Sequence, residues 1–485
     1  MLACLIDERR DNRESEDEAD YAKQITRSRL RETGQEKQRG NKMPENTLSK
    51  IHIDIPDNVG FIIKTLEDKG FEAYAVGGCV RDTLIGRTPG DWDITTSALP
   101  HEIKSCFRRT VDTGIEHGTV TVMFGSESYE VTTYRIDGEY RDNRHPDSVS
   151  FTSSVREDLR RRDFTINAMA YNERTGILDL FGGCEDLKAG IIRCVGDADE
   201  RFDEDALRIL RAVRFAAQLD FKIEEHTANA VKRHAINLQA VSKERILTEI
   251  TKLICSAHIE RIFDIFELGL APYISEHFDE INIYGLKELI TTKDTTERHG
   301  RYLSTEERRA LDDAFDYEKT TSYELRFARF AMLAEGMKPE HVKKMIKGLK
   351  PDNDTLHNTE LLIKLLYVPL SDDRYELKTQ MADVPPKLFY CLLRLKAVSC
   401  RTKLYKERCR NEKLENVIAL YEDIMKTDEP IYLKELAVNG GDLISCGVKP
   451  GPELGEMLKR LLDLVHREPQ HNDKNFLKEK ALNIL

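Results

Sequence analysis

The sequence predicts an α+β fold, in which a small domain built on a mixed sheet precedes a long helical part. Two patterns predict this fold. Strand-like segments alternate with helices and turns between residues 71 and 134, whereas from Asp199 onward apolar residues recur at helical spacing almost to the end. The length of 485 residues exceeds what one hydrophobic core holds, and about three domains are expected.

The first elements follow from caps, strand composition and turn residues. Pro56, Asp57 and Asn58 favour the start of a helix that ends at Gly70, and a short apolar strand is expected over 71–76. The next segments expected are a strand over 92–96, a helix over 100–107, a strand near 109–112, and a hairpin of strands 118–124 and 129–134 with the turn Gly125-Ser126-Glu127-Ser128.

After residue 134 the sequence predicts a long loop and then mainly helices. Residues 135–150 form a polar stretch without periodicity, which predicts a long loop, and the α/β pattern ends near residue 190. Expected helices include 204–219, 224–234 and 242–255, helix breaks are expected at 438–441 and 447–452, and Pro452 suits the first turn of a long helix. Residues 1–50 are charge-dense and expected to be disordered, and 275–320 carry no motif.

Composition narrows the class of protein. Hydrophobic residues make up 40% and charged residues 33% of the chain, and no apolar run approaches the roughly 20 residues of a membrane span. The ten cysteines are never spaced as Cys-x-x-Cys, which argues against a zinc ribbon and for a reducing, cytoplasmic location. The net charge of -12 disfavours nucleic acid on average, but four arginines in 156–162 and four in 201–214 leave room for a basic surface.

The segment from Gly77 to Asp93 carries the first candidate site. The glycine pair after the strand allows a tight turn whose backbone N–H groups can approach a phosphate. Asp91 and Asp93 are two apart, so that on a strand both carboxylates would face one spot near this turn. Paired carboxylates beside phosphate oxygens suit Mg²⁺. An Asp-x-Asp pair alone is more often a solvated turn, and the glycine turn is what favours a metal site.

Two further clusters extend this site. Glu130 would reach the same metals if its strand lies beside the Asp91/Asp93 segment, and three carboxylates around two metal ions suit nucleotidyl transfer; the alternative is a solvent-facing strand residue. Arg160, Arg161 and Arg162 can clamp phosphate oxygens, and Asp163 can accept a hydrogen bond from a ribose hydroxyl.

Taken together, these motifs resemble the class II tRNA nucleotidyltransferases of bacterial type, the CCA-adding enzymes of the polymerase-β-like superfamily. The resemblance rests on Gly-Gly-x-Val-Arg-Asp at 77–82, Asp-x-Asp at 91–93, Glu-Val-Thr-Thr-Tyr-Arg at 130–135 and Arg-Arg-Asp-Phe-Thr-x-Asn-Ala-Met at 161–169. It continues through segments 179–187, 192–196, 204–211 and 242–246, and so spans residues 71 to about 250.

The resemblance implies roles for individual residues. Asp91, Asp93 and Glu130 would be catalytic, with Asp91 and Asp93 holding the metals. Nucleotide contacts would come from Gly77, Gly78, Arg81, Arg162, Asp163, Asn167, Asp205, Arg208 and Arg211. Asp205 and Arg208, three apart on the expected helix, would pair with the amino group and ring nitrogen of cytosine or adenine and reject uracil and guanine. Arg211 would hold Asp205 or Glu204.

The resemblance also implies an activity and an architecture. The activity is the addition of C, C and A to the 3′ end of tRNA from CTP and ATP with Mg²⁺, with no membrane and no protein partner indicated. The domains expected are a catalytic head over 51–190, a neck over 191–250, a body over 251–375 and a tRNA-binding tail over 376–485. Enzymes that add only CC or only A, bacterial poly(A) polymerases, and a non-catalytic tRNA-binding protein remain alternatives.

Overall fold

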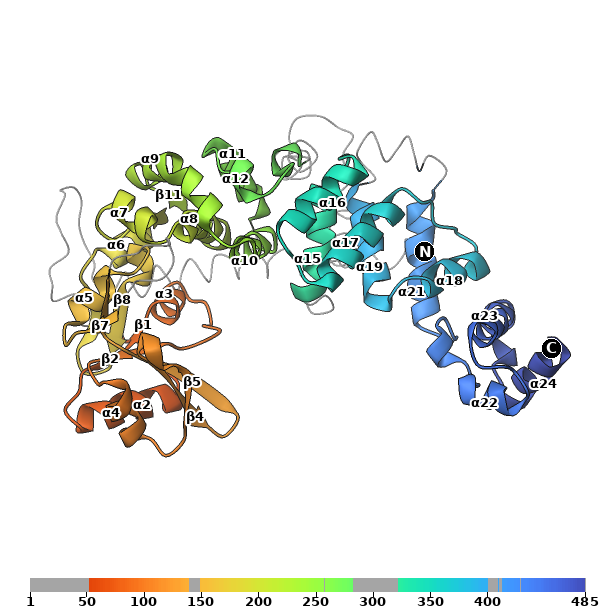
Figure 1. Ribbon diagram of the computed structural model, residues 1–485, viewed down its shortest axis with the longest axis horizontal. Coiled ribbons are helices and arrows are strands. Elements are labelled where there is room, and N and C mark those ends of the chain that lie inside the picture. The colour runs from red at the N-terminus through yellow and green to blue at the C-terminus, as the bar shows by residue number, and fades with distance from the viewer. Residues whose placement is uncertain are drawn as a thin grey trace, which may run out of the picture. The chain divides into compact units, whose positions relative to one another are not determined.

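The computed structural model describes residues 52–138, 149–256, 258–281, 322–399, 409, 412–427 and 429–484. Two compact units are distinguished by their internal contacts, residues 1–242 with 267–270 and residues 243–266 with 271–485. The strands of the described chain all lie in the first unit, and the second is helical (Figure 1). The expectations for residues 1–50, for the interior of the polar loop and for most of 275–320 lie outside the described residues.

A seven-stranded sheet organises the first unit. Its strand order is β3-β4-β5-β2-β1-β8-β9. The strands are β1 (Ala73–Val76), β2 (Ile94–Thr96), β3 (Thr110–Gly114), β4 (Thr119–Phe124), β5 (Glu127–Thr133), β8 (Met169–Asn172) and β9 (Gly176–Asp179). Neighbours pair antiparallel except β2 and β5, which pair parallel with Ile94 opposite Val131. The mixed sheet predicted from the sequence is therefore confirmed.

Helices cover this sheet as their apolar spacing requires. In α2 (Asp57–Asp68) the buried residues Val59, Ile62, Ile63 and Leu66 form one face, and this face packs against β1 and β2. The short helix α4 (Pro100–Cys106) contacts α2, and the two lie together beside the strands (Figure 1). The other short helices are α3 (Gly78–Leu84), α5 (Val155–Arg160) and α6 (Gly183–Ala189).

The hairpin and the polar loop differ from prediction in detail. The turn between β4 and β5 consists of Gly125 and Ser126 alone, and the predicted turn residues Glu127 and Ser128 belong to β5, where they pair with β4. Gly125 has φ +61°, a conformation that glycine adopts without strain and that a two-residue hairpin turn needs. The polar loop is bounded by two paired strands, β6 (Arg135–Asp137) and β7 (Val149–Phe151).

The first unit ends in α7 (Ala198–Glu204), α8 (Leu207–Leu219) and α9 (Glu225–His234). The single helix predicted over 204–219 was wrong at its start, because α7 ends at Glu204 and α8 begins at Leu207. Two short parallel strands, β10 (Ile191–Ile192) and β11 (Lys222–Ile223), also pair here. The predicted neck is therefore mostly helical, with this one strand pair added.

The second unit contains only helices and connections in its described residues. Its α-helices are α10 (Lys243–Ile254), α11 (Phe263–Glu267), α12 (Ala271–Ile274), α15 (Ser322–Leu333), α16 (Pro339–Gly348), α17 (Asn353–Leu366), α18 (Arg374–Ala382), α19 (Pro386–Ser399), α21 (Leu414–Met425), α22 (Gly440–Ser445), α23 (Pro452–Arg467) and α24 (Lys474–Ile484). Helices α15, α17 and α19 pack together, and α23 contacts α18, α22 and α24. No helix in the described part of the chain has the length and apolar character needed to cross a membrane.

The expected helix break at 438–441 is wrong in its second half. Gly440 and Gly441 open α22, because Asn439 accepts a hydrogen bond from the Asp442 N–H and the Asp442 carboxylate accepts one from the Asn439 N–H. This reciprocal cap offsets the low helix propensity of two glycines. Pro452 begins α23 as predicted.

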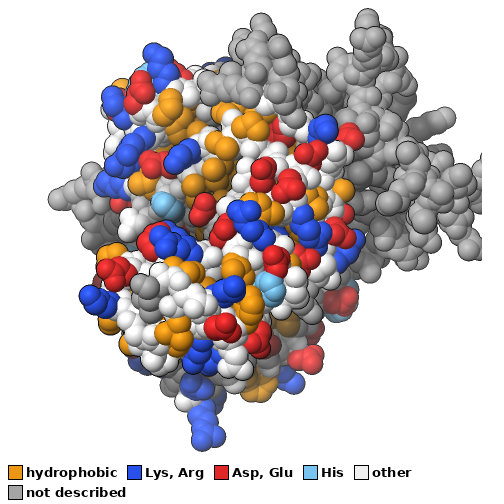
Figure 2. Space-filling model, turned by 90° about the vertical axis from the view of Figure 1, so that its right-hand side faces the viewer, with side chains coloured by type: hydrophobic (Ala, Val, Ile, Leu, Met, Phe, Trp, Pro, Cys, Tyr) orange, Lys and Arg blue, Asp and Glu red, His pale blue; other side chains and the backbone are white. Residues whose placement is uncertain are grey.

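The surface of the second unit mixes charges. Figure 2 shows Lys and Arg side chains spread among acidic and apolar ones over the face that it views. Examples with paired charges are Lys474 and Lys478, which both contact Asp442. The negative net charge of the chain is therefore compatible with cations dispersed over this face.

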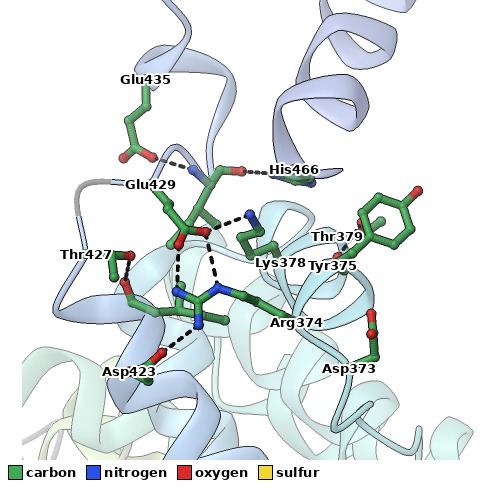
Figure 3. Close-up of polar contacts among 12 residues, drawn as sticks. Asp373, Arg374, Tyr375, Lys378, Thr379, Asp423, Thr427, Glu429, Glu435 and His466 are labelled. Carbon is green, nitrogen blue, oxygen red and sulfur yellow. Dashed lines mark hydrogen bonds and ion pairs between the residues drawn. The ribbon is translucent and has the colours of Figure 1, made fainter. Parts of the chain in front are cut away.

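A polar cluster joins α18, α21 and α23 near residue 429 (Figure 3). The Glu429 carboxylate accepts hydrogen bonds from Arg374 (Nη2 to Oε1, 2.7 Å) and from the buried Lys378 (Nζ to Oε2, 2.9 Å), and Arg374 also binds Asp423 at 2.6 Å. Beside it, His466 contacts the Ile431 carbonyl at 3.0 Å. The hydrogen bonds from Arg374, with those from Lys378, outweigh burial and lower the pKa of Glu429 to about 2.

This cluster predicts a pH-dependent contribution to stability. Because the pKa of Glu429 is lower in the folded chain than its usual value of 4.5, its contribution is full above about pH 4.5 and is lost as the pH falls towards about 2. Replacing Glu429 by Gln should lower the free energy of unfolding of the second unit by about 1–3 kcal/mol at pH 7. Urea unfolding at pH 7 and pH 3 measures the difference, which should shrink at the lower pH; an equal difference at both would contradict the prediction.

Candidate active site

The glycine turn after β1 is built as the sequence predicts. Gly77 adopts φ +84° and donates its N–H to the Met169 carbonyl at 3.1 Å, and Gly78 opens α3. A Cβ placed on Gly77 would lie 2.9 Å from Nη1 of Arg162. The turn thus needs glycine both for its backbone conformation and for the close approach of an arginine.

Asp91, Asp93 and Glu130 lie close together at the end of the sheet where β2 begins. We refer to these three residues as the acidic edge. Asp91 and Asp93 lie in the extended segment just before β2, and the Asp93 carbonyl accepts the Val76 N–H at 3.0 Å, which ties this segment to β1. Because β2 pairs parallel with β5 and Ile94 lies opposite Val131, Asp93 and Glu130 occupy neighbouring positions. The predicted neighbourhood of Glu130 and the Asp91/Asp93 segment is confirmed.

The pKa of Asp93 shows that the negative charges of these carboxylates repel one another. Burial is the largest cause that raises the pKa of Asp93, and the negative charges of Asp91 and Glu130 raise it further, against the lowering effect of Arg162. Repulsion of this kind is relieved by a bound cation. Within the described residues the three carboxylates are not all within 4.8 Å of one another, so they form a more open set than a bound ion requires. The carboxylates are of the chemical kind that binds a divalent cation.

A polar cavity of about 150 Å³ opens beside these residues. It is lined by Val76, Asp93, Ile94, Thr119, Glu130, Thr132, Arg135, Arg161 and Arg162. Carboxylates and arginines thus share one cavity. Such a pairing of charges suits a ligand that combines a metal cation with phosphate oxygens.

Asp158 holds the arginines of the cavity in place. It is fully buried on α5 and accepts two hydrogen bonds from Arg161, at 2.7 and 3.0 Å, while Nη2 of Arg162 lies 3.5 Å away. Thr95 of β2 donates a further hydrogen bond at 3.1 Å. Burial would raise the pKa of Asp158, but the charges of Arg161 and Arg162 outweigh it, so that the pKa is lowered. Nε of Arg162 is buried without a hydrogen-bond partner.

A second network links the Arg-Arg-Asp segment to α3 and α8. The Asp163 carboxylate accepts bonds from Asn167 (3.1 Å) and from Arg211 (Nε 2.8 Å, Nη2 2.6 Å), and Asn167 in turn accepts one from Arg81 at 2.6 Å. Burial would raise the pKa of Asp163, but Arg211, Asn167 and Arg208 lower it to about 2. Arg81 and Arg211 also lie over the ring of Phe215. Four of the predicted nucleotide-binding residues therefore form one network, which is buried except at Arg211.

Asp205 and Arg208 are placed differently from the prediction. They do not lie three apart on one helix, because Asp205 has φ -142° and ψ 101° and separates α7 from α8. Its carboxylate accepts the Leu207 N–H at 3.1 Å, as an N-terminal cap does. Arg208 is buried and binds Glu204 at 2.6 Å and the Arg161 carbonyl at 2.8 Å. Arg211, expected to hold Asp205 or Glu204, binds Asp163, a partner that the sequence did not indicate.

Comparison with known proteins identifies the family. Family models match residues 73–193 ("Poly A polymerase head domain"), 220–281 ("Probable RNA and SrmB- binding site of polymerase A") and 319–481 (tRNA nucleotidyltransferase domain 2). A CCA-adding enzyme of Pediococcus pentosaceus is 36% identical over 420 residues, which cover 85% of this chain and 94% of that one. The chain belongs to the CCA-adding enzymes. The resemblance inferred from the motifs is thereby confirmed.

Other CCA-adding enzymes support the assignment. That of Lactobacillus helveticus is 38% identical over 405 residues, 83% of this chain and 91% of its own. The crystal structure of the Bacillus stearothermophilus CCA-adding enzyme in complex with CTP has a TM-score of 0.65 to the present structure at 30% identity, and covers 88% of this chain and 96% of that one. The predicted fold class, a mixed-sheet head followed by helical segments, is the one found in this family.

In this member of the CCA-adding enzymes, the sequence interpretation missed two site residues. Asp158 precedes Arg161 and Arg162 by three and four residues, a spacing that predicts ion pairs on one helix face, and this signal was available. Thr95 gave no such signal, since its hydroxyl reaches Asp158 only through the pairing of β2 in the sheet.

Proposed function

We propose that this chain adds C, C and A to the 3′ end of tRNA, using CTP and ATP and releasing pyrophosphate. The observation that carries the proposal is full-length similarity at 36–38% identity to CCA-adding enzymes, together with an acidic edge beside a glycine turn. In this reaction the 3′-hydroxyl of tRNA attacks the α-phosphate of the nucleotide, and the bond from that phosphorus to the pyrophosphate oxygen breaks.

We propose Mg²⁺ as the ion held by Asp91 and Asp93, with Glu130 as a supporting carboxylate. When bound there, it would activate the attacking hydroxyl and neutralise charge on the leaving oxygens. The mutual repulsion that raises the pKa of Asp93 supports cation binding at this edge. The ions Mg²⁺ and Mn²⁺ can be compared directly by following CTP incorporation after chelation and metal replacement.

The roles that we propose for the arginines and their neighbours follow from the contacts of these residues. Arg161 and Arg162 would bind the phosphates of the incoming nucleotide, because they line the same cavity as Asp93 and Glu130. Asp158 would act as a positioning residue for both. Gly77 and Gly78 would let the nucleotide approach the backbone. Arg81, Asp163, Asn167 and Arg211 would form the wall next to its sugar, held together by the hydrogen bonds described above.

We also propose the division of labour along the chain: a head over 51–190, a neck over 191–250, a body over 251–375 and a tRNA-binding tail over 376–485. The match of the head-domain model to residues 73–193 supports the first boundary. Cations dispersed among other side chains over the face in Figure 2 support a tRNA surface built from many weak phosphate contacts. A cytoplasmic location is proposed with support from the described cysteines, which are all free thiols.

One assay distinguishes CCA addition from the activities of the related poly(A) polymerases, CC-adding enzymes and A-adding enzymes. The purified chain is incubated with tRNA that lacks the CCA end and with CTP alone, ATP alone, or both. Addition of two residues with CTP and of a third with both nucleotides is expected. Growth beyond one A would indicate the poly(A) polymerase, which the head-domain match keeps as the second candidate. Products that stop after CC, or that start only on tRNA ending in CC, would indicate the partial enzymes.

Base selection gives a sharper prediction. If the Asp205 carboxylate accepts the amino proton of cytosine or adenine, Asp205→Asn should lower the preference for CTP over UTP, in kcat/KM, by about 10–100-fold. Asparagine retains an oxygen that can accept the Leu207 N–H and so preserves the cap of α8. The matched control is Asp203→Asn on α7, an exposed residue that contacts His234. Equal selectivity in the two variants would contradict the role of Asp205.

A further inference from the structure

Two histidines and a glutamate gather in the second unit, in segments that the proposed function does not use. His277 precedes the short 3₁₀ helix of Phe278–Glu280, and His341 lies on α16. Nδ1 of His277 is 2.7 Å from Oε1 of Glu280, and Nδ1 of His341 is 2.6 Å from Oε2 of the same carboxylate. The two imidazole rings stack, with centroids 3.9 Å apart and planes 5° apart.

We propose that His277, Glu280 and His341 form a second metal site, which takes Zn²⁺ or an ion of similar chemistry. Their ligand atoms lie within 4.8 Å of one another, and in the described part of the chain no other group of three or more such residues meets this condition. Two imidazole nitrogens and one carboxylate oxygen are ligands that Zn²⁺ prefers and Mg²⁺ does not. The fourth position would be taken by water, because Glu280 is exposed.

The side chains must rearrange locally when an ion binds. Metal–ligand bonds of about 2.0–2.2 Å place the ligand atoms of a tetrahedral site about 3.3 Å apart. The present 2.6 and 2.7 Å spacings are those of hydrogen bonds, so these nitrogen and oxygen atoms must separate by less than 1 Å. The stacked rings direct their nitrogen lone pairs in parallel planes, so at least one imidazole must also tilt out of the stack for both to reach one ion. In the metal-bound form each Nδ1 gives its lone pair to the ion and the neutral ring carries its one proton on Nε2. A ring whose proton lies on Nδ1 releases that proton to solvent and takes one from solvent at Nε2, which is a change of tautomer.

The surroundings of His277 support this change of tautomer. Its Nε2 is buried and makes no hydrogen bond, while Oε1 of Glu276 lies 3.2 Å away and is fixed by Lys344 at 3.0 Å. A carboxylate in this position can accept a hydrogen bond from the Nε2–H, as it does behind many metal-bound histidines. His277 also has φ +63°, a conformation that residues other than glycine rarely adopt and that persists where the surroundings impose it.

The site would act as a clip within the second unit. Glu280 and His341 are 61 residues apart in sequence. The metal would join the short 3₁₀ helix that contains Glu280 to α16. Binding to the folded state alone would stabilise this connection. The clip uses residues of the second unit and the acidic edge uses residues of the first. Variants in one can therefore be tested without altering the residues of the other, and failure of the clip is distinguishable from failure of the proposed function.

The test uses the full chain, stripped of metal with a chelator and kept free of Mg²⁺. Zinc chloride is titrated by calorimetry, and Co²⁺ is added as a spectroscopic probe. We expect His341→Gln to bind one equivalent of zinc less than the unmodified chain, to lose the rise in Tm that zinc produces, and to lose the visible absorption of tetrahedral Co²⁺. His357→Gln, an exposed histidine on α17, is the matched control and should behave like the unmodified chain.

Two further measurements keep the proposal open to refutation. Asp93→Asn should leave this zinc equivalent in place, because it alters only the acidic edge. If His341→Gln unfolds, Glu280→Gln removes the anionic ligand and serves as the second variant. The proposal is overturned if the unmodified chain binds no zinc beyond what Asp93→Asn removes, or if the His341 and Glu280 variants bind as much zinc as the His357 control.

Discussion

Replacing Asp93 by Asn is expected to lower kcat/KM for CTP incorporation by about 10³-fold or more, because in the proposed mechanism the change removes a charged ligand worth several kcal/mol in the transition state. Asn has the same shape, so the fold should persist. The measurement is incorporation of labelled CTP into tRNA that lacks CCA. The matched control is Asp112→Asn on β3, whose exposed carboxylate pairs with Lys104 and should tolerate the change.

A second readout distinguishes lost chemistry from lost folding. The folded-state pKa of Asp93 is raised, so its charged form opposes folding at neutral pH. Asp93→Asn should therefore raise the Tm of the metal-free chain, while activity falls. A fall in activity smaller than about tenfold, or a drop in Tm that accounts for it, would count against the catalytic role.

Lys396→Met should be the most destabilising single change in the second unit, with an expected loss of about 3–5 kcal/mol. The Lys396 ammonium is fully buried, and it binds the carbonyls of Leu366 and Val368 and the carboxylate of Glu412 at 2.8–3.1 Å. Burial lowers the pKa of Lys396. Methionine fills the space of the stem but removes the cation beside a buried carboxylate.

The chain offers both a control and a reporter for this experiment. Lys413→Met breaks an exposed pair with Asp372, at 3.5 Å, and should cost less than about 1 kcal/mol. The only tryptophan, Trp92, lies in the first unit, so its fluorescence follows that unit while circular dichroism follows both. Lys396→Met should shift the circular-dichroism transition in urea and leave the tryptophan transition in place. Equal stability of the two lysine variants would refute the prediction.

The sequence predicted local structure well where a single pattern decided it. The apolar spacing in α2, the strand–glycine turn at Val76–Gly78 and the proline at the start of α23 each appear where expected. The predicted neighbourhood of Glu130 and Asp93 also holds, although it required an assumption about strand pairing that no local pattern contains.

The failures have a common physical cause, which is competition between local propensity and a specific hydrogen bond. The helical pattern of 204–219 continues through Asp205, but the Asp205 carboxylate caps α8 and interrupts the helix. Conversely, Gly440 and Gly441 look like a helix break, and the reciprocal bonds of Asn439 and Asp442 make them a helix start. The pairing of Arg211 with Asp163 spans 48 residues and depends on tertiary structure alone.

The sheet topology has a consequence for synthesis on the ribosome. Strand β1, which the Asp93 segment joins, has β8 as its other neighbour, with Ala75 opposite Tyr171. The acidic residues are therefore translated well before the strand that completes their support. We expect the nascent chain to acquire its ordered acidic edge only after about residue 172 has emerged, because such long-range pairing must wait for its partner.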